Sequence, residues 1–258
     1  MLFEKVYIEG LDYHLPEDIV TSAEIEKRLA PLYERLKLPQ GRLELMSGIK
    51  ERRFWDKGIV PSEVATIAGE KAIARAGINK DNIGCLISAS VCRDFIEPST
   101  ASIIHRNLKI PSEAFVFDVS NACLGVLNGM MIIANMIDQN QILAGLVVAG
   151  ENGGPLLNNT IETLLSRPDI TRSTIKSSFA SLTIGSAAVG VVLSHKKISR
   201  QGHRLMGGVS LAETQFNHLC RGNDDSGTSG NWSPLMETDS EALMKEGCRL
   251  AGKTWERT

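Results

Sequence analysis

The sequence lacks the motifs that identify several classes of metal, disulfide and nucleotide-binding protein. Its 258 residues contain no Cys-x-x-Cys pair, and an odd number of cysteines argues against both a zinc site and a disulfide framework. No GxGxxG or P-loop arrangement of glycines is present, which gives no support to a nucleotide-cofactor enzyme. We therefore expect no cofactor and no metal. Five reduced thiols are expected instead, at Cys85, Cys92, Cys123, Cys220 and Cys248.

A strong charge of one sign and long apolar runs are also absent. The 28 basic and 30 acidic residues nearly cancel, and no Lys/Arg-rich block stands out, so nucleic acid is not an expected partner. The N-terminal MLFEKVYIEG has no basic stretch followed by a long apolar one, and no window reaches the roughly 20 apolar residues of a membrane span. The sequence predicts a cytoplasmic protein with no membrane span.

The sequence does contain an alternation of β-branched runs and helical patterns. Strands are expected at residues 4–10, 82–91, 114–120, 143–150, 187–194 and 204–213, and most are apolar on both faces, as buried parallel strands are. Helices are expected at residues 61–77, 98–108, 123–137 and 238–258, the last opened by a Thr238-x-x-Glu241 capping box. Two stretches, 151–178 and 221–234, interrupt this pattern. The alternation predicts a layered α/β fold.

The segment 123–137 differs from the other predicted helices. Apart from Asn128 and Asn135 it is apolar on all sides, and a helix of that kind lies inside a protein rather than on its surface. We expect it to lie between two sheets.

Cys123 stands where a predicted strand turns directly into this helix, in DVSNACLGVLNG. Two interpretations compete. A free cysteine is commonly a small buried apolar residue. At a helix N-terminus, however, the dipole stabilises the thiolate, and the cysteine's own N–H can serve as one donor of an oxyanion hole. The second interpretation predicts acyl transfer from a thioester.

The segment DVSNACLGVLNG resembles the active-site segment of β-ketoacyl synthase III and its relatives in the thiolase superfamily. The segments SGIKERR (47–53), SVCRDFIEPSTASIIHRNLKI (90–110) and LCRGND (219–224) are most similar to the branch that joins two acyl-CoA chains head to head to begin long-chain olefin synthesis. The resemblance implies a five-layered αβαβα fold of two similar halves, and a homodimer. It also implies that Cys123 accepts an acyl group. Residues 1–200 would form the N-terminal half, and residues 201–258 the start of the second.

Glu97 is the second candidate catalytic residue. One interpretation is structural, because Pro98 fits the first position of a helix and Glu97 is a favourable charge at its start. The resemblance instead implies a glutamate that reaches the active site of the neighbouring subunit. A malonyl thioester forms its carbanion by losing carbon dioxide, whereas an unactivated acyl thioester needs a base to remove its α-proton. Glu97 therefore favours a non-decarboxylative Claisen condensation.

Other family positions depart from the pattern or are not found. The resemblance implies a catalytic histidine and asparagine and a glycine amide from the second half, which would lie beyond Thr258, so we expect a longer chain. None of the five histidines matches the catalytic one. The usual acidic-glycine pair is replaced by Gly185-Ser186, and Arg42 and Met46 stand where chain-initiating synthases hold coenzyme A. No coenzyme A contact is therefore assigned.

The leading hypothesis is an acyltransferase that condenses two acyl-CoA molecules through an acyl-Cys123 intermediate. Glu97 of a partner subunit would act as the base. Acyl-CoA would be a substrate rather than a cofactor, and acyl carrier protein is an alternative carrier. Two alternatives stay open: a decarboxylative β-ketoacyl synthase III that initiates fatty acid synthesis, and a non-catalytic half-fold that binds a partner.

Overall fold

A computed structural model describes residues 1–222 and 235–258, so most of the predicted irregular stretch 221–234 lies outside the described residues. The chain forms two compact units. Unit 1 comprises Met1–Pro16, Asp56–Asn152 and Ala187–Gly208, and unit 2 comprises Glu17–Trp55, Gly153–Ser186 and Val209–Thr258. The division into residues 1–200 and 201–258 stays a prediction.

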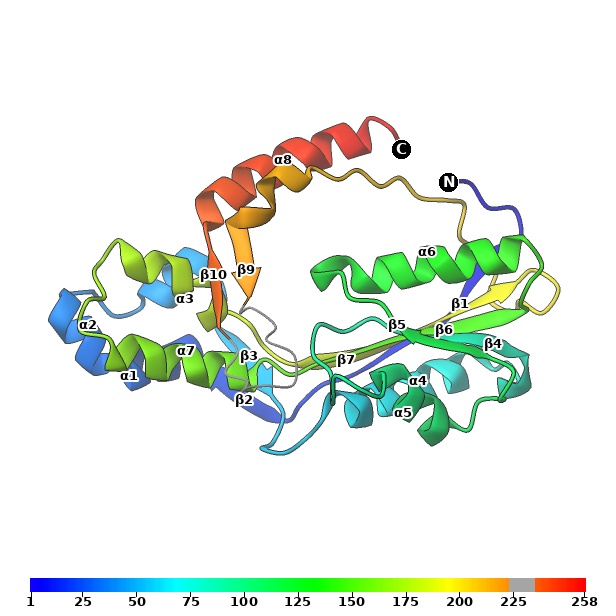
Figure 1. The fold of residues 1–258 in the computed structure, drawn as a ribbon, viewed down its shortest axis with the longest axis horizontal. Coiled ribbons are helices and arrows are strands. Elements are labelled where there is room, and N and C mark those ends of the chain that lie inside the picture. The colour runs from blue at the N-terminus through cyan, green and yellow to red at the C-terminus, as the bar shows by residue number, and fades with distance from the viewer. Residues whose placement is uncertain (223–234) are drawn as a thin grey trace. The chain divides into compact units, whose positions relative to one another are not determined.

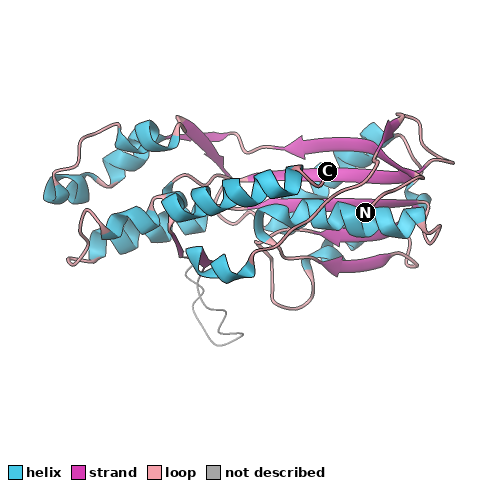
Figure 2. Ribbon diagram, turned by 90° about the horizontal axis from the view of Figure 1, so that it is seen from above, coloured by secondary structure: helices cyan, strands magenta, loops and turns pink. Residues whose placement is uncertain are grey.

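Unit 1 contains a six-stranded mixed sheet in the order β5-β4-β6-β7-β1-β8, whose strands lie side by side in Figure 2. Its strands are β1 (Val6–His14), β4 (Ile83–Ser88), β5 (Phe115–Asp118), β6 (Ala144–Glu151), β7 (Ala187–His195) and β8 (His203–Arg204). β4, β5 and β6 are parallel, whereas β7 is antiparallel to both β6 and β1. The strand pattern predicted the positions of five strands, but not the direction of β7, because burial on both faces makes any central strand apolar.

Helices cover both faces of this sheet (Figure 1). α4 (Pro61–Ala76) and α5 (Thr100–Leu108) pack on one face, and α6 (Gly125–Asp138) packs on the other. α4 begins with Pro61 at its first turn and ends at Gly77, which has a φ of 65°. A short 3₁₀ turn, η1 (Lys80–Asn82), leads into β4. Unit 1 therefore has three layers, helix, sheet and helix.

The strand predicted at residues 204–213 is wrong for most of its length. Only His203–Arg204 pairs with β1, followed by a single bridge between Leu2 and Gly207. A side chain at Gly207 would collide with the carbonyl oxygen of Met1, so the close approach of the two segments requires glycine there.

Unit 2 is built mainly of helices around a separate apolar core that includes Ile25, Leu29, Leu43, Leu157 and Leu164. Its helices are α1 (Ser22–Arg28), α2 (Ala30–Leu36), α3 (Arg42–Ser47), α7 (Gly154–Ser166) and α8 (Ser240–Trp255), with 3₁₀ turns η3 (Thr174–Ser178), η4 (Ala180–Leu182) and η5 (Thr214–Leu219). Two small antiparallel sheets pair β2 (Asp18–Thr21) with β3 (Glu51–Phe54), and β9 (Cys220–Gly222) with β10 (Met236–Thr238).

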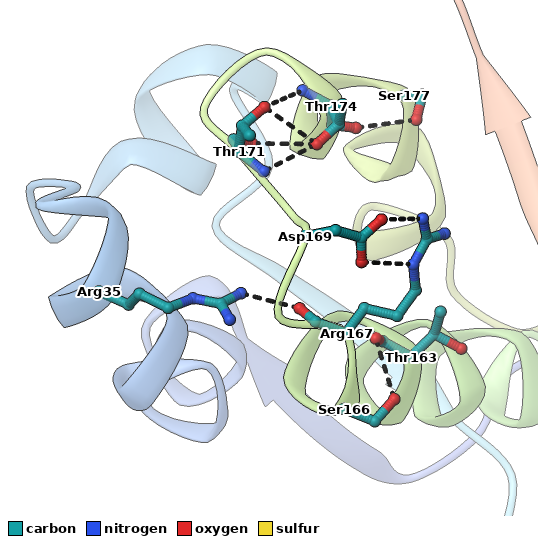
Figure 3. A network of polar contacts seen from close by, with 8 residues as sticks. All are labelled: Arg35, Thr163, Ser166, Arg167, Asp169, Thr171, Thr174 and Ser177. Carbon is teal, nitrogen blue, oxygen red and sulfur yellow. Dashed lines mark hydrogen bonds and ion pairs between the residues drawn. The ribbon is translucent and has the colours of Figure 1, made fainter.

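The stretch 151–178, irregular in the sequence pattern, contains α7 and an ordered connection (Figure 3). Arg35 donates to the carbonyl of Arg167 at 3.0 Å, and the Arg167 guanidinium pairs with Asp169. Thr171 and Thr174 exchange backbone and hydroxyl hydrogen bonds, which begins the turn η3. The sequence predicts a helix in part of this stretch, which α7 confirms, and local polar contacts order the connection that follows it.

The N-terminal cap of α8 lies one residue later than its sequence pattern predicts. Asp239 caps the helix by accepting from the Ala242 N–H at 3.0 Å, whereas Thr238 is the last residue of β10 and its hydroxyl donates to the Cys220 sulfur. Within the described residues, none of the helices has the length and apolarity needed to cross a membrane. No group of three or more metal-ligating side chains is found in the same residues.

Candidate active site

Cys123 lies in a tight turn between β5 and α6. β5 ends at Asp118, and the Val119 N–H donates to the Ser88 carbonyl at 2.8 Å. Ala122 has a φ of 44°, in the left-handed region, and η2 (Ala122–Leu124) follows, with Leu124 N–H donating to Asn121 at 3.0 Å. α6 starts at Gly125, two residues after the cysteine. The Cys123 side chain is exposed among the described residues, whereas a structural free cysteine is commonly buried.

Two glycines bring the start of α6 close to the sheet. A Cβ at Gly125 would lie 2.5 Å from the Ala89 carbonyl oxygen, and one at Gly129 would lie 2.9 Å from a methyl group of Val147. Both distances are shorter than van der Waals contact permits. The glycines therefore set the depth of the helix, and through it the position of Cys123.

α6 packs on one face of the sheet in unit 1, and its expected position between two sheets stays a prediction. Gly129, Ile133 and Ile137 are buried against the sheet, whereas Leu127 is 56% exposed. The helix therefore carries apolar side chains on its exposed face as well as on the face that packs on the sheet.

The other cysteines have different environments. Burial raises the pKa of Cys85 to about 12. Burial, reinforced by the negative charge of Glu151, also raises the pKa of Cys92 to about 12. Cys220 and Cys248 are exposed, and the Cys220 sulfur accepts from Thr238 at 3.4 Å. Burial keeps Cys85 and Cys92 protonated at neutral pH.

Glu97 is exposed in the loop 89–99, which follows β4 and leads into α5. Ser99 caps α5, which begins at Thr100, so Pro98 precedes the cap and does not occupy the first helical position. Ser88 and Asp118 are register partners in the parallel strands β4 and β5, which places the loop of Glu97 and the turn of Cys123 at the same edge of the sheet. Within the described residues, neither side chain has a hydrogen-bond partner.

Carboxylates that the sequence pattern did not single out hold the loop 89–99. Glu151, at the end of β6, accepts from the N–H groups of Val91 and Cys92 at 2.7 and 3.2 Å. Asp94 accepts from the Ser62 N–H at the start of α4, at 2.9 Å. For Glu151 the only signal in the sequence is an acidic residue where an apolar strand ends, and Asp94 has no such signal.

The outer part of the same loop presents apolar side chains. Val91, Phe95 and Ile96 are 53%, 58% and 48% exposed. Phe115, on the edge strand β5, is 61% exposed. Exposed apolar groups of this size around a site are typical of surfaces that bind a partner.

Unit 2 contains a cavity of about 130 Å³ with four cations on its wall: Lys37, Arg42, Arg172 and Lys176. Leu38, Ile175 and Phe179 contribute apolar surface. Arg172 donates to the Leu36 and Lys37 carbonyls, both at 2.6 Å, which fixes the end of α2. The cavity combines positive charge with an apolar wall.

The start of α3, which carries Arg42, is also fixed. The buried Glu26 carboxylate accepts from the Gly41 N–H at 2.6 Å and the Leu43 N–H at 2.7 Å. A second cavity of unit 2, of about 570 Å³, has Lys176 and Glu241 on its wall, 3.6 Å apart. The sequence pattern predicted neither cavity, because their walls come from segments far apart in the chain.

Comparisons with known proteins identify relatives along the whole chain. No protein-family model matches it. The acyl-CoA:acyl-CoA alkyltransferase of Shewanella oneidensis is 39% identical over 259 residues, which cover 99% of this chain and 74% of that protein. The enzyme of the same name from Xanthomonas campestris is 40% identical over 255 residues, covering 99% of this chain and 72% of that protein. A β-ketoacyl-[acyl-carrier-protein] synthase III of Koribacter versatilis is 29% identical over 59% of this chain.

Solved structures agree with the sequence relatives. Crystal structures of Xanthomonas campestris OleA match with a TM-score of 0.90 at 39% identity, covering 99% of this chain and 71% of that one. One of the matching OleA structures holds bound cerulenin. The match confirms the predicted thiolase-like α/β fold. Unit 1 forms three layers, helix, sheet and helix, and the five-layered arrangement stays a prediction. With relatives of about 40% identity across nearly its full length, the chain belongs to the acyl-CoA:acyl-CoA alkyltransferase family.

Proposed function

We propose that this protein condenses two acyl-CoA molecules head to head through an acyl-Cys123 intermediate. The observation that carries the proposal is similarity over 99% of this chain to two acyl-CoA:acyl-CoA alkyltransferases, in a chain that presents an exposed cysteine on a strand-to-helix turn. The Cys123 thiolate attacks the thioester carbonyl of the first acyl-CoA, and the coenzyme A thiolate leaves. The N–H of Cys123 serves as one oxyanion donor, because the first N–H groups of a helical turn have no partner within it.

The second half of the reaction forms the carbon–carbon bond. Glu97 removes an α-proton from the second acyl-CoA, and the resulting enolate attacks the acyl carbonyl on Cys123. The Cys123 thiolate leaves, and the product is a β-ketoacyl-CoA. Glu97 lies in an exposed loop whose outer residues Phe95 and Ile96 are apolar, which supports a role in the site of a neighbouring copy.

We also propose a homodimer. β5 is an edge strand of the described sheet, and Phe115 on it is 61% exposed. An exposed edge strand is suited to pairing with another chain, and most soluble homo-oligomers are twofold dimers. Localisation in the cytoplasm and acyl carrier protein as an alternative carrier stay predictions of the sequence.

The cationic cavity of unit 2 is proposed to bind the phosphates of coenzyme A. Guanidinium and ammonium groups form charge-assisted hydrogen bonds with phosphate. This proposal gives Arg42 the coenzyme A contact that the family pattern alone did not support. Arg42→Ala should raise KM for acyl-CoA about 10-fold with kcat unchanged, as expected for the loss of one hydrogen bond to a charged group.

The corresponding acyl-pantetheine, which has no nucleotide phosphates, tests that assignment. Its KM should be the same in the wild type and in Arg42→Ala. Arg75→Ala, which removes an exposed cation paired with Asp12 in unit 1, is the control. An equal rise in KM for both substrates would show that Arg42 does not bind phosphate.

The experiment that tests the proposed function replaces Glu97 by glutamine. Glu97→Gln should still acylate Cys123 but should condense about 10²–10⁴-fold more slowly, the usual contribution of a general base. Intact mass spectrometry would show the accumulated acyl-enzyme. Glu113→Gln, which changes an exposed glutamate elsewhere in unit 1, is the matched control.

A decarboxylative synthase is the second candidate, favoured by the more distant synthase III relatives. It requires a malonyl thioester and releases one carbon dioxide per turnover. Condensation that needs a malonyl thioester, at the same rate in Glu97→Gln, would support that candidate. A chain that never gains the mass of an acyl group would instead support a binding module.

A further inference from the structure

The Asp118 carboxylate bridges the two segments that carry the proposed catalytic residues. It lies at the end of β5, five residues before Cys123, and both of its oxygens accept from the first turn of α5. Oδ1 accepts from the Ala101 N–H at 2.8 Å, and Oδ2 accepts from the Thr100 N–H at 3.0 Å. α5 follows the loop of Glu97 directly, so Asp118 fixes the end of that loop.

The rest of the loop is fixed in the same way. Glu151 binds its first residues through the N–H groups of Val91 and Cys92, and Asp94 joins it to the start of α4. The Asp94 N–H in turn donates to the hydroxyl of Thr100 at 3.4 Å, and Thr100 is almost completely buried. Glu97 itself makes no such contact within the described residues. Its position therefore depends on how firmly the two ends of its loop are held.

We propose that Asp118 is the positioning residue for the Glu97 carboxylate, an inference that rests on the proposed role of Glu97 as the base. Asp118 belongs to the strand that leads into Cys123, so one carboxylate holds the segment of the nucleophile and the segment of the base. Because Glu97 serves the site of the neighbouring copy, Asp118 also fixes the nucleophile of one site relative to the base of the other.

The charge of Asp118 suits it to this role. A carboxylate at a helix N-terminus is stabilised by the free N–H groups and by the helix dipole. Asparagine has nearly the same shape but no charge. Its N–H₂ group would replace one of the two carboxylate oxygens, so one of the two backbone N–H groups would lose its acceptor. Asp118→Asn should therefore loosen the α5 end of the loop without removing volume.

The test measures two steps of the reaction in the assembled enzyme. Asp118→Asn should lower the rate of condensation by about 10–10²-fold, the effect expected when a catalytic group is misplaced by about 1 Å. The rate of Cys123 acylation, followed as the burst of coenzyme A release, should be unchanged. Glu24→Gln, which removes a charge from the capping box of α1 in unit 2, should change neither step.

A double-mutant cycle separates positioning from a general structural role. Asp118→Asn should cause no further loss of condensation in the Glu97→Gln background, because Asp118 acts through Glu97. If Asp118→Asn does not fold, Glu151→Gln frees the other end of the same loop and should give the same split between acylation and condensation. The inference would be overturned if Asp118→Asn slowed acylation as much as condensation. It would also be overturned if Asp118→Asn slowed condensation by the same factor in the wild type and in Glu97→Gln.

The failure of this inference differs from the failure of the proposed function. If Glu97→Gln does not condense acyl-CoA but Asp118→Asn condenses it at the wild-type rate, only the proposed role of Asp118 is wrong. If Glu97→Gln condenses acyl-CoA at the wild-type rate, the proposed roles of Glu97 and of Asp118 are both wrong.

Discussion

At the scale of single residues, the thiols of this chain differ mainly in their access to water. Cys123 is exposed on a turn that precedes a helix, whereas burial raises the pKa of Cys85 and of Cys92 to about 12. A thiol with that pKa is almost entirely protonated at neutral pH, and the thiolate is the nucleophile. Candidate nucleophiles are therefore limited to the exposed cysteines.

Alkylation measures this difference directly. Iodoacetamide at pH 7.5 should label Cys123 first, while Cys85 and Cys92 should react much more slowly, because burial raises the pKa of each to about 12. Peptide mapping against time gives the order. Cys220 and Cys248 are exposed controls that do not lie at the start of a helix. If Cys92 were labelled before Cys123, the assignment of Cys123 as the nucleophile would be contradicted.

His195 offers a second prediction, on stability. It is buried at the end of β7, its Nδ1 accepts from the Lys197 N–H at 3.0 Å, and its Nε2 lies 3.2 Å from the Asn140 side-chain oxygen. Burial lowers the pKa of His195, the nearby charges of Lys197, Lys5 and Lys196 lower it further, and Asp138 opposes them. The folded state therefore favours the neutral ring.

The stability that depends on neutral His195 should be present above pH 6.5 and should fall as the pH drops below it. In that range the unfolded chain binds the proton and the folded chain does not. Tm measured from pH 8 to pH 5 should fall more steeply in the wild type than in His195→Gln. His203→Gln, at an exposed position, should keep the wild-type slope, and parallel curves for all three proteins would refute the assignment.

At the scale of elements, the position of the nucleophile is set by backbone packing. α6 approaches the sheet through Gly125 and Gly129, which lie against Ala89 and Val147. Any side chain at Gly125 would meet a backbone carbonyl, which can yield only if the helix shifts. The same shift would move the turn of Cys123.

Gly125→Ala should destabilise the fold by about 1–3 kcal/mol, the usual cost of overpacking, and should slow acylation of Cys123. Gly247→Ala in α8 is the control, since no atom lies within 4 Å of the added Cβ among the described residues. That change should be neutral or stabilising by up to about 1 kcal/mol, because alanine favours helix. Denaturant unfolding and the burst of coenzyme A release measure the two effects.

The sequence predicted best those elements in which burial requires apolar residues. The apolar runs located five of the six strands in the sheet, and the glycine and proline positions located both ends of α4. The sequence predicted where the turn of Cys123 lies but not its backbone geometry. An alanine at position 122 gives no sign that its φ is positive. Asp118 and Glu151 were missed because their partners are backbone N–H groups of a distant segment.

At the scale of the whole molecule, the proposed dimer should depend on the edge strand β5. Phe115→Glu would place a charge on the exposed apolar surface of that strand, once in each copy of a twofold interface. The wild type should have the mass of two chains in light scattering, and Phe115→Glu should raise the Kd of the dimer by more than about 10-fold. Leu45→Glu, at an exposed position in unit 2, is the control, and a wild-type monomer that condenses acyl-CoA would refute the dimer.

The pairing of β1 has a consequence for how the chain is made. Among the described strands, β1 (Val6–His14) pairs only with β7 (Ala187–His195) and β8, so the first strand to leave the ribosome has no strand partner until about 180 residues later, although α4 can pack on one of its faces before then. At synthesis rates of about 5–20 residues per second, it waits roughly 10–40 s. Throughout that time an apolar strand with two open edges is exposed to other nascent chains. Chaperones that cover these open edges during translation should therefore raise the yield of folded protein.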